Sequence, residues 1–363
     1  MGVRDGYSRA RRALGDRSTA LAVAVVGGLL ALDLLRRLFT GMVAPGQVAT
    51  YLWTGLVIGL IYGLAGIGLS LTYSILSFAN FAHGDHVTAG AFSGWAVAYA
   101  IAGSGAAELG SRLLVQASPG QVGASIVSTP LAILAGLLAA MVLAVALALV
   151  MDRLVYKPMR GAEGISLLIA SVGVAFALRY LLAFVFGTNS RGVTASVPRY
   201  TIGGLVVNAH EITLAATALA LMLGVHLLLQ RTKLGKAMRA MADNEDLARV
   251  TGIPTERVIR WTWIVGGGLA GAAGYLVVLK TGTISYSFGW VLLLLIFAAV
   301  ILGGIGSVYG AMAGGVIIGL TENVALVWLR GPYSDFTLPV AFGLMILILL
   351  VRPSGLFGGV TTA

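Results

Sequence analysis

Long apolar runs alternate with short polar segments along this chain, and the runs are of membrane length. A transmembrane helix needs roughly 20 mostly apolar residues. Ten segments meet this rule, near residues 19–38, 50–73, 86–103, 129–150, 165–187, 211–230, 259–280, 289–305, 308–329 and 336–351. Only Gly306 and Ser307 separate the eighth from the ninth, so these two could form one long broken helix. The pattern predicts an all-α integral membrane protein of about ten spans (8–10), in a single membrane domain over residues 1–363.

The composition strengthens this prediction and removes several alternatives. Hydrophobic residues make up 58% of the 363 positions and charged residues only 10%, with a mean hydropathy of +0.94. That apolar surface exceeds what one soluble core could bury. Cysteine is absent, which excludes a disulfide framework and a thiolate metal site. The four histidines are too scattered to propose a metal centre, and no cofactor is expected; they are His83, His86, His210 and His226.

The net charge of +10 does not indicate nucleic-acid binding, because the basic residues gather at the ends of the apolar runs. Ten crossings with the N-terminus inside place 16 of the 24 Lys and Arg residues on the inner face. Five of them belong to a basic cytoplasmic N-terminus at 1–18, and the first apolar run is interpreted as a retained helix. We therefore expect a multi-pass protein of the cell (inner) membrane with both termini in the cytoplasm.

The longest stretch without a membrane-length apolar run is a charged loop at 231–258, which this orientation places in the cytoplasm. We expect two short helices in it, one over 234–242 and a second that Asp243 caps, with a stop at Gly252 and Pro254. A solvated loop without a partner is the alternative to a docking loop. Four apolar side chains on this charged hairpin favour docking, because they need a surface to pack on: Met238, Met241, Leu247 and Val250.

A polar interruption follows the second apolar run, in the stretch SFANFAHGD at 77–85. Asn80, His83 and Asp85 stand where backbone groups freed from a helix must find partners inside the protein. Two interpretations remain open. These side chains either hold the break in shape or line a transport pathway. In both cases we expect one interrupted helix near 75–85.

Three further ionisable residues, Asp33, Arg179 and Glu322, lie in or near the spans. A charge inside the membrane needs a partner or a water-filled cavity. Each of the three therefore forms a structural pair or faces a pathway. For Glu322, the candidate partner near the outer surface is Arg330.

Glycines within the spans indicate close helix packing. Gly55, Gly59 and Gly63 follow the G-x-x-x-G spacing that lets two helices approach in lipid. The glycine-rich stretch at 299–319 resembles a phosphate-binding loop in letters only, because it has neither the preceding strand nor the required lysine. No catalytic triad, metalloprotease motif or pair of catalytic carboxylates stands at usable spacing. The sequence thus carries no catalytic apparatus of its own, and we do not expect an enzyme.

Five segments together resemble the permease subunits of branched-chain amino acid ABC importers. They are NFAHGD at 80–85, RAMADNEDLARVTGIPTERV at 239–258, LAGAAGYL at 269–276, AVILGGIGSVYGAMAGGVIIGL at 299–320 and RPSGLFG at 352–358. The resemblance implies a subunit that pairs with a second, homologous permease and binds two cytoplasmic ATP-binding subunits. It also implies an extracytoplasmic substrate-binding protein, with transport driven by the partners' ATP hydrolysis.

The same resemblance assigns roles to particular residues. It makes the 231–258 loop the coupling loop that docks on the ATPases, through five positions that match the family: Ala240, Asp243, Ala248, Gly252 and Ile253. Asn80, His83, Asp85 and Glu322 are the pathway candidates.

Three alternatives stay open. The same architecture could import urea or short amides. An ion-coupled secondary transporter would work without ATPases, with His83, Asp85 or Glu322 handling ions. An intramembrane enzyme would need a reactive constellation that the sequence lacks.

Overall fold

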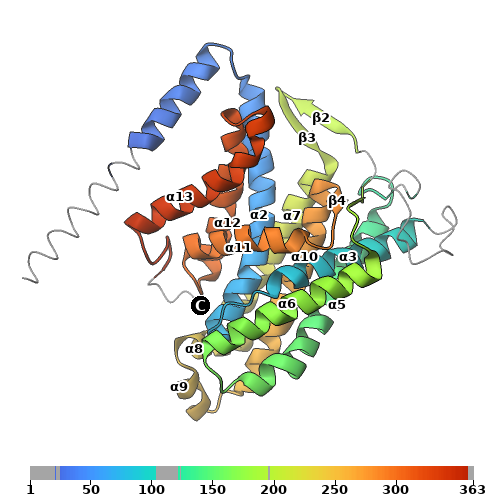
Figure 1. Cartoon of the computed structure of the whole chain (residues 1–363), viewed down its shortest axis with the longest axis vertical. Coiled ribbons are helices and arrows are strands. Elements are labelled where there is room, and N and C mark those ends of the chain that lie inside the picture. The colour runs from blue at the N-terminus through green and yellow to red at the C-terminus, as the bar shows by residue number, and fades with distance from the viewer. Residues whose placement is uncertain (1–20, 22–24, 104–121, 123, 195–196, 359–363) are drawn as a thin grey trace, which may run out of the picture.

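The computed structural model describes residues 21, 25–103, 122, 124–194 and 197–358, and this part of the chain is mostly helical (Figure 1). Residues 25–39 form a helix before the first labelled one. The labelled α-helices are α2 Pro45–Leu76, α3 His83–Ala102, α5 Pro130–Met151, α6 Gly164–Phe186, α7 Ala209–Arg231, α8 Lys233–Asp243, α9 Glu245–Val250, α10 Thr255–Thr281, α11 Phe288–Gly303, α12 Val308–Val324 and α13 Thr337–Val351.

The remaining elements are short. A π-helical turn, Asp152–Tyr156, and a 3-10 turn, Lys157–Met159, continue α5, and two more 3-10 turns, Ala325–Val327 and Gly331–Phe336, connect α12 to α13. Four strands form two antiparallel pairs that close the connections between helices. These are β1 Arg191–Gly192 with β4 Thr283–Ile284, and β2 Arg199–Ile202 with β3 Leu205–Asn208.

Within the described residues, seven helices are long and apolar enough to cross a membrane. This confirms a helical, multi-pass protein. Three of the ten expected spans are not among these seven helices. The run at 19–38 lies partly outside the described residues. The run at 86–103 belongs to α3, whose first turn carries polar residues. The run at 289–305 is α11, with only 16 residues. It is separated from α12 by a turn at 304–307, so these are two helices and not one broken helix.

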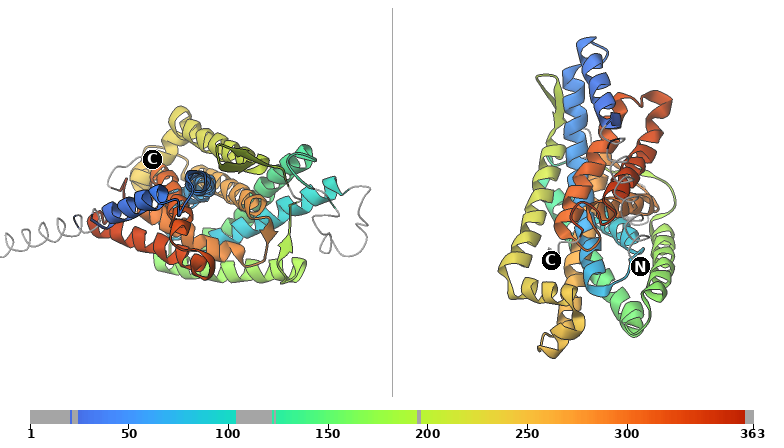
Figure 2. Two further views of the ribbon diagram at one scale, coloured as in Figure 1. Left: turned by 90° about the horizontal axis from the view of Figure 1, so that it is seen from above. Right: turned by 90° about the vertical axis from the view of Figure 1, so that its left-hand side faces the viewer.

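The interior is built around α2 and α10. Figure 2 shows α2 end-on with other helices around it, and most residues of both helices are buried. In contrast, α5, α6, α7 and α13 turn most of their surface outward, and that surface is apolar. An apolar outer face is the expected complement of lipid. The described part of the chain is therefore arranged as buried helices inside a lipid-facing layer.

Glycines set the close contact between α2 and α12. A Cβ added at Gly59 would lie 2.8 Å from the Val316 Cα, and one at Gly55 would lie 2.9 Å from the Gly319 carbonyl oxygen. Gly315 in turn packs on Gly63. The G-x-x-x-G spacing thus marks a true interface, and its partner face on α12 is formed by Gly315 and Gly319.

Helix α3 begins inside the membrane-spanning region and not at its edge. The His83 Nε2 lies 3.0 Å from the carbonyl oxygen of Ala65. Ala65 stands 11 residues before the end of α2 at Leu76, which corresponds to roughly 16 Å along that helix at about 1.5 Å per residue. Residues 77–82 therefore fold back toward the middle of the molecule. This confirms the interrupted helix expected near 75–85.

Helix α11 meets this re-entrant start. The backbone N–H of Gly289 donates to the Thr88 hydroxyl of α3 at 3.2 Å. Figure 1 shows α11 running across the molecule, at a steep angle to α2. The interrupted segment is thus covered by a helix that lies crosswise.

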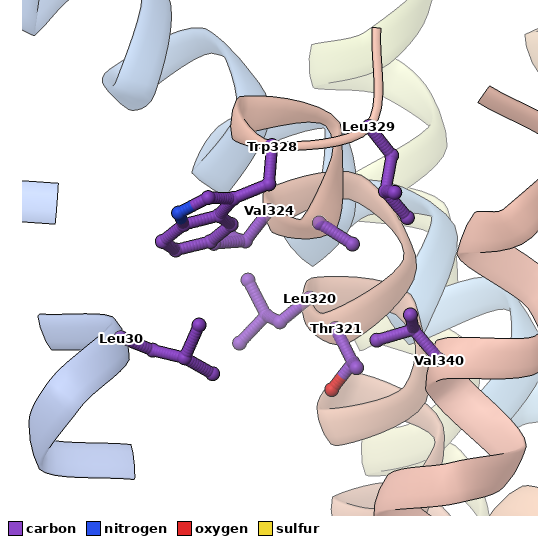
Figure 3. Close-up of a pocket in the computed structure, with 8 residues that line it drawn as sticks. Leu30, Leu320, Thr321, Val324, Trp328, Leu329 and Val340 are labelled. Carbon is purple, nitrogen blue, oxygen red and sulfur yellow. The ribbon is translucent and has the colours of Figure 1, made fainter. Parts of the chain in front are cut away.

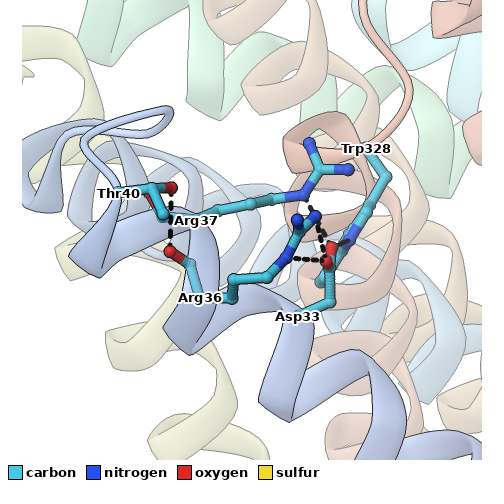
Figure 4. A network of polar contacts seen from close by, with 5 residues as sticks. All are labelled: Asp33, Arg36, Arg37, Thr40 and Trp328. Atoms are coloured by element: carbon cyan, nitrogen blue, oxygen red, sulfur yellow. Dashed lines mark hydrogen bonds and ion pairs between the residues drawn. The ribbon is translucent and has the colours of Figure 1, made fainter.

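Asp33 fastens the helix at 25–39 to Trp328, which directly follows the 3-10 turn after α12. Its carboxylate accepts from Arg36, Arg37 and the Trp328 indole, the last at 2.9 Å (Figure 4). Below this contact, an apolar pocket of about 500 Å³ separates the helix from α12 and α13 (Figure 3). Asp33 therefore forms a structural pair and does not face a pathway.

Candidate functional site

The break after α2 is held by side chains that take the place of helical hydrogen bonds. Ser77 has a left-handed backbone, with φ of 55°, which ends α2. The Asn80 side-chain oxygen accepts from the backbone N–H of Ala82 at 3.1 Å, and the N–H of Phe81 donates to the Ser171 hydroxyl of α6 at 3.0 Å. Because these N–H groups have partners inside the protein, the irregular backbone can persist at this depth.

The two histidines that follow are both bonded to backbone carbonyls. His83 contacts the Ala65 carbonyl of α2, and the His86 Nδ1 lies 2.7 Å from the carbonyl oxygen of Ala82. The side chains of Asn80, His83 and His86 are all at most 3% exposed. They are therefore in position to fix the start of α3.

Asp85 forms an ion pair with Arg179 of α6, and both side chains are buried. Two nearly parallel hydrogen bonds connect them, from Nε to Oδ1 at 3.1 Å and from Nη2 to Oδ2 at 2.9 Å. The Arg179 guanidinium lies 4.4 Å from the Trp290 ring centre and 5.1 Å from that of Phe176. A bidentate ion pair flanked by aromatic rings suits the planar guanidinium of Arg and not the ammonium group of Lys. The pair ties α3, α6 and α11 together at the break.

Glu322 does not join this group. Its carboxylate accepts from the Tyr62 hydroxyl of α2 at 3.1 Å. The candidate pairing with Arg330 is wrong, because the Arg330 guanidinium donates to the Gln47 side chain instead. The structure thus brings Asn80, His83 and Asp85 together and leaves Glu322 at a separate place, on α12 and against Tyr62 of α2. Among the described residues, no group of three or more His, Asp or Glu could hold a metal ion.

The central loop folds as the two expected helices, with one correction. Thr232 caps α8, and the Asn244 side chain, not that of Asp243, caps α9 by accepting from the Leu247 N–H at 2.9 Å. Asp243 is the last residue of α8. The stop at Gly252 is confirmed: its φ is +86°, and the Ile253 N–H bonds back to the Ala248 carbonyl. This is the Schellman arrangement that a C′ glycine favours.

The apolar side chains of this hairpin divide into two groups. Met238 and Met241 are 1% and 3% exposed and pack into the protein's own core. Leu247 and Val250 are 60% and 80% exposed on α9. The first pair has found its packing surface within the chain. The second pair remains uncovered on the projecting end of the loop (Figure 1).

The five coupling-loop positions also differ in exposure. Ala248 is buried, Ala240 and Ile253 are half-buried, and Asp243 and Gly252 are exposed. The buried and half-buried positions shape the hairpin and hold it on the body. The exposed positions are free to meet another protein.

Tyr156 links the end of the molecule that carries the α8–α9 hairpin to the break, and sequence reasoning missed it. Its hydroxyl donates to the Asn80 side-chain oxygen at 3.2 Å. Its ring stacks on Trp263 of α10, with ring centres 5.1 Å apart, and packs on Phe78 at 5.3 Å. The side chain is 1% exposed. Because the π-helical turn that carries it lies 76 residues from Asn80, no local pattern points to this contact.

A charged cluster extends the link to the start of α10. Arg160 donates two 3.0 Å hydrogen bonds to Asp152 and also pairs with Glu256, while Lys157 lies 3.1 Å from Glu256. Desolvation acts to lower the pKa of Arg160, but the hydrogen bonds to Glu256 and Asp152 outweigh it and raise that pKa above its usual value. Arg160 therefore stays charged at physiological pH. Since Glu256 follows α9 by only a few residues, the α8–α9 hairpin and the Asn80 segment share one set of contacts.

These features define a class of protein: a multi-pass membrane protein with a re-entrant polar segment and a structured hairpin at one end, which are features of transport proteins. The family model described as "Branched-chain amino acid transport system / permease component" matches residues 51–349. The chain belongs to this family of permeases.

Curated relatives agree with the family. The chain is 29% identical over 310 residues to the high-affinity branched-chain amino acid transport system permease protein BraD of Pseudomonas aeruginosa, covering 84% of this chain and 94% of BraD. It is 30% identical over 318 residues to the corresponding protein LivH of Escherichia coli K12, covering 85% and 94%. A shorter match, 27% over 129 residues, is to the E. coli permease protein LivM, covering 35% and 29%. No solved structure matches the chain.

Proposed function

We propose that this chain is the permease subunit of an ABC importer that moves branched-chain amino acids into the cell. Two cytoplasmic ATP-binding subunits drive it, a second homologous permease completes the pathway, and an extracytoplasmic binding protein delivers the substrate. Both termini and the α8–α9 hairpin face the cytoplasm. The proposed substrate is the one for which BraD and LivH, the relatives that align with most of this chain, are named.

The observation that carries the proposal is the exposed apolar tip of α9. Leu247 and Val250 present bare aliphatic surface on a hairpin that projects beyond the lipid-facing helices. A soluble partner that covers them would gain roughly 25 cal/mol per Å² of apolar surface buried. An ATP-binding subunit is the partner that an ABC permease requires.

The contacts behind the hairpin give its movement a route to the membrane interior. A displacement of α9 shifts the start of α10 and its Glu256, which pairs with Arg160. Arg160 holds the turn that carries Tyr156, and Tyr156 holds Asn80. Closure of the ATP-binding subunits would thus act on the segment containing Asn80, His83 and Asp85. We propose that this segment and Glu322 change their surroundings during transport.

The test is uptake by the complete complex reconstituted in vesicles with its binding protein. We expect ATP-dependent accumulation of leucine, isoleucine and valine. Uptake of urea or short amides alone would keep the architecture and replace the substrate. Uptake that follows an ion gradient and needs no ATPase would overturn the proposal in favour of a secondary transporter.

A further inference from the structure

A polar cavity of about 380 Å³ opens at the end of the molecule opposite the α8–α9 hairpin. It lies between the start of α7, the end of α10 and the β2–β3 hairpin. Its side chains are hydrogen-bonding or charged for the most part. They include Arg199, Asn208, His210, Lys280 and Thr281.

The charges around this cavity leave one uncompensated cation. Lys280 pairs with Glu211, whose other carboxylate oxygen accepts from the Trp53 indole at 3.0 Å. The Lys280 and Glu211 side chains are only 15% and 8% exposed, so this pair is part of the wall. In the part of the chain that is described, Arg199 has no ion-pair partner and is exposed. The mouth is therefore suited to an anionic group such as a carboxylate.

A second, apolar cavity lies directly beneath and shares His210 and Leu279 with the first. The His210 Nε2 accepts from the backbone N–H of Ile126 at the approach to α5, at 3.2 Å, which fixes the ring at the boundary. The lower cavity, of about 70 Å³, lies between α5, α7 and α10. Its walls include Ile133, Leu134, Leu137, Leu214, Thr217 and Leu276.

The size of the lower cavity limits what can enter. One water molecule needs roughly 10–15 Å³ of cavity, so about 70 Å³ accommodates around five non-hydrogen atoms. That matches a branched aliphatic side chain and is far too small for a lipid acyl chain.

One polar atom at the lower cavity has no partner. The Tyr275 hydroxyl, on a side chain that is 1% exposed, forms no hydrogen bond within the described structure. The tyrosine lines the lower cavity, with its hydroxyl against Gly136 of α5. This hydroxyl has almost no free surface, so the tyrosine forms part of the cavity wall and not a contact for a polar ligand atom.

We propose that these two cavities form one binding site for an aliphatic α-amino acid. The carboxylate lies at the mouth beside Arg199, and the aliphatic side chain enters the apolar cavity. This inference rests on the proposed function, because it makes the site a station for the substrate on the side where a binding protein would release it.

The test is equilibrium binding of radiolabelled leucine to the whole complex in lipid nanodiscs, without ATP or binding protein. Saturable binding is expected, with competition by isoleucine and valine. Leucinol, which lacks the carboxylate, should compete at least about tenfold more weakly, since a charge-assisted hydrogen bond is lost. No saturable leucine binding, or equal competition by leucinol, would overturn the site.

Matched variants locate the binding. Thr217→Leu fills the apolar cavity, whereas Ala216→Leu adds the same side chain at the neighbouring exposed position. Thr217→Leu should weaken leucine binding about tenfold and Ala216→Leu should leave it unchanged. Arg199→Gln should also weaken leucine binding about tenfold. Arg330→Gln, which removes an exposed cation elsewhere, should leave leucine binding unchanged. Equal affinities within either pair would refute the proposal.

One further readout separates failures. ATP-driven uptake by the same preparation tests the proposed function independently. Binding at this site without uptake would refute the proposed function alone. If the Thr217→Leu variant takes up and binds leucine as well as the wild type does, the binding site alone is refuted.

Discussion

At the scale of single residues, the pairing of Asp85 with Arg179 has the largest consequences. Both charges are taken out of water, and the two parallel hydrogen bonds and the flanking rings compensate for that cost. The carboxylate of Asp85 is thus committed to a partner. An ion-coupled mechanism would need this carboxylate to be available, so the pair weighs against that alternative.

Replacing one member of this pair should destabilise the protein strongly. Asp85→Asn leaves the buried guanidinium without its counter-charge, and we expect a loss of about 3–5 kcal/mol. Glu245→Gln breaks the exposed pair with Arg249 and should cost less than about 1 kcal/mol. Thermal unfolding of the purified complex, followed by fluorescence-detected size exclusion, compares the two. Equal melting temperatures for both variants would contradict the structural role assigned to the Asp85 pair.

Residue-scale predictions from sequence succeeded where the cause is local. The stop at Gly252 was predictable because a left-handed backbone next to a proline favours glycine. The cap of α9 was assigned to Asp243 and not Asn244, because adjacent Asp and Asn can both cap and only the backbone decides. The partner of Arg179 could not be predicted, since Asp85 lies 94 residues away.

At the scale of helices, glycine spacing sets the geometry. The α2 and α12 backbones are close enough that a methyl group at Gly59 would meet Val316 backbone atoms. Such contacts replace the hydrophobic driving force, which is absent between helices in lipid. The spacing was visible in the sequence, but the choice of Gly315 and Gly319 as the partner face required the fold.

Gly59→Ala should therefore destabilise the protein, by about 1–3 kcal/mol, because the two helices must separate. Gly224→Ala, within α7, is the matched control: a Cβ there meets nothing within 4 Å. Alanine favours a helix over glycine, so this control should be neutral or about 0.5–1 kcal/mol more stable. Urea or heat denaturation of both variants measures the difference. A Gly59→Ala variant as stable as Gly224→Ala would show that the interface is looser than the structure has it.

Helix count was less predictable than helix existence. A count of apolar runs treats α3 and α11 as full membrane spans, like α2. Hydropathy does not show where in the membrane a helix begins or ends. The re-entrant start of α3 depends on contacts with Ala65 and Gly289, which are made by other helices. The polar residues at 77–85 located the break in the helix, but they did not show that the chain folds back after it.

At the scale of the whole molecule, the hairpin and the break are opposite ends of one set of contacts. Leu247 and Val250 mark the outer end, and Asn80 the inner one. The residues between them are tied by hydrogen bonds, ion pairs and ring stacking. Docking and transport should therefore be separable by mutation.

The docking end can be tested through complex formation. Leu247→Asp together with Val250→Asp places charges on the surface proposed to be covered, so the ATP-binding subunits should copurify at less than about a tenth of the wild-type level. Replacing Ile212 and Leu219 of α7 with Asp would not serve as a control, because both side chains lie on the lipid-facing surface. Arg257→Asp, exposed just beyond the hairpin, changes charge without removing apolar surface and should retain more of the partner. Undiminished copurification in the Leu247/Val250 variant would remove the docking role.

The inner end can be tested through coupling. Tyr156→Phe keeps the stacking on Trp263 but loses the hydrogen bond to Asn80. We expect leucine uptake to fall about five- to tenfold at saturating substrate while ATP hydrolysis continues, consistent with the loss of one hydrogen bond of roughly 1 kcal/mol. Tyr180→Phe, at an exposed position on α6, is the control. The ratio of ATP hydrolysed to leucine transported measures the effect, and an unchanged ratio would argue against this route.

The re-entrant start of α3 also constrains how the protein is made. Asp85 needs Arg179, 94 residues later, and the Thr88 hydroxyl accepts from Gly289, 201 residues later. When a ribosome has just completed α3, neither partner has been synthesised. The polar first turn of α3 must then wait beside the insertion machinery or at the membrane surface until α6 and α11 arrive. Insertion of this segment is therefore a late step that follows the synthesis of α11, and chains that stop before α11 would leave its polar groups without these partners.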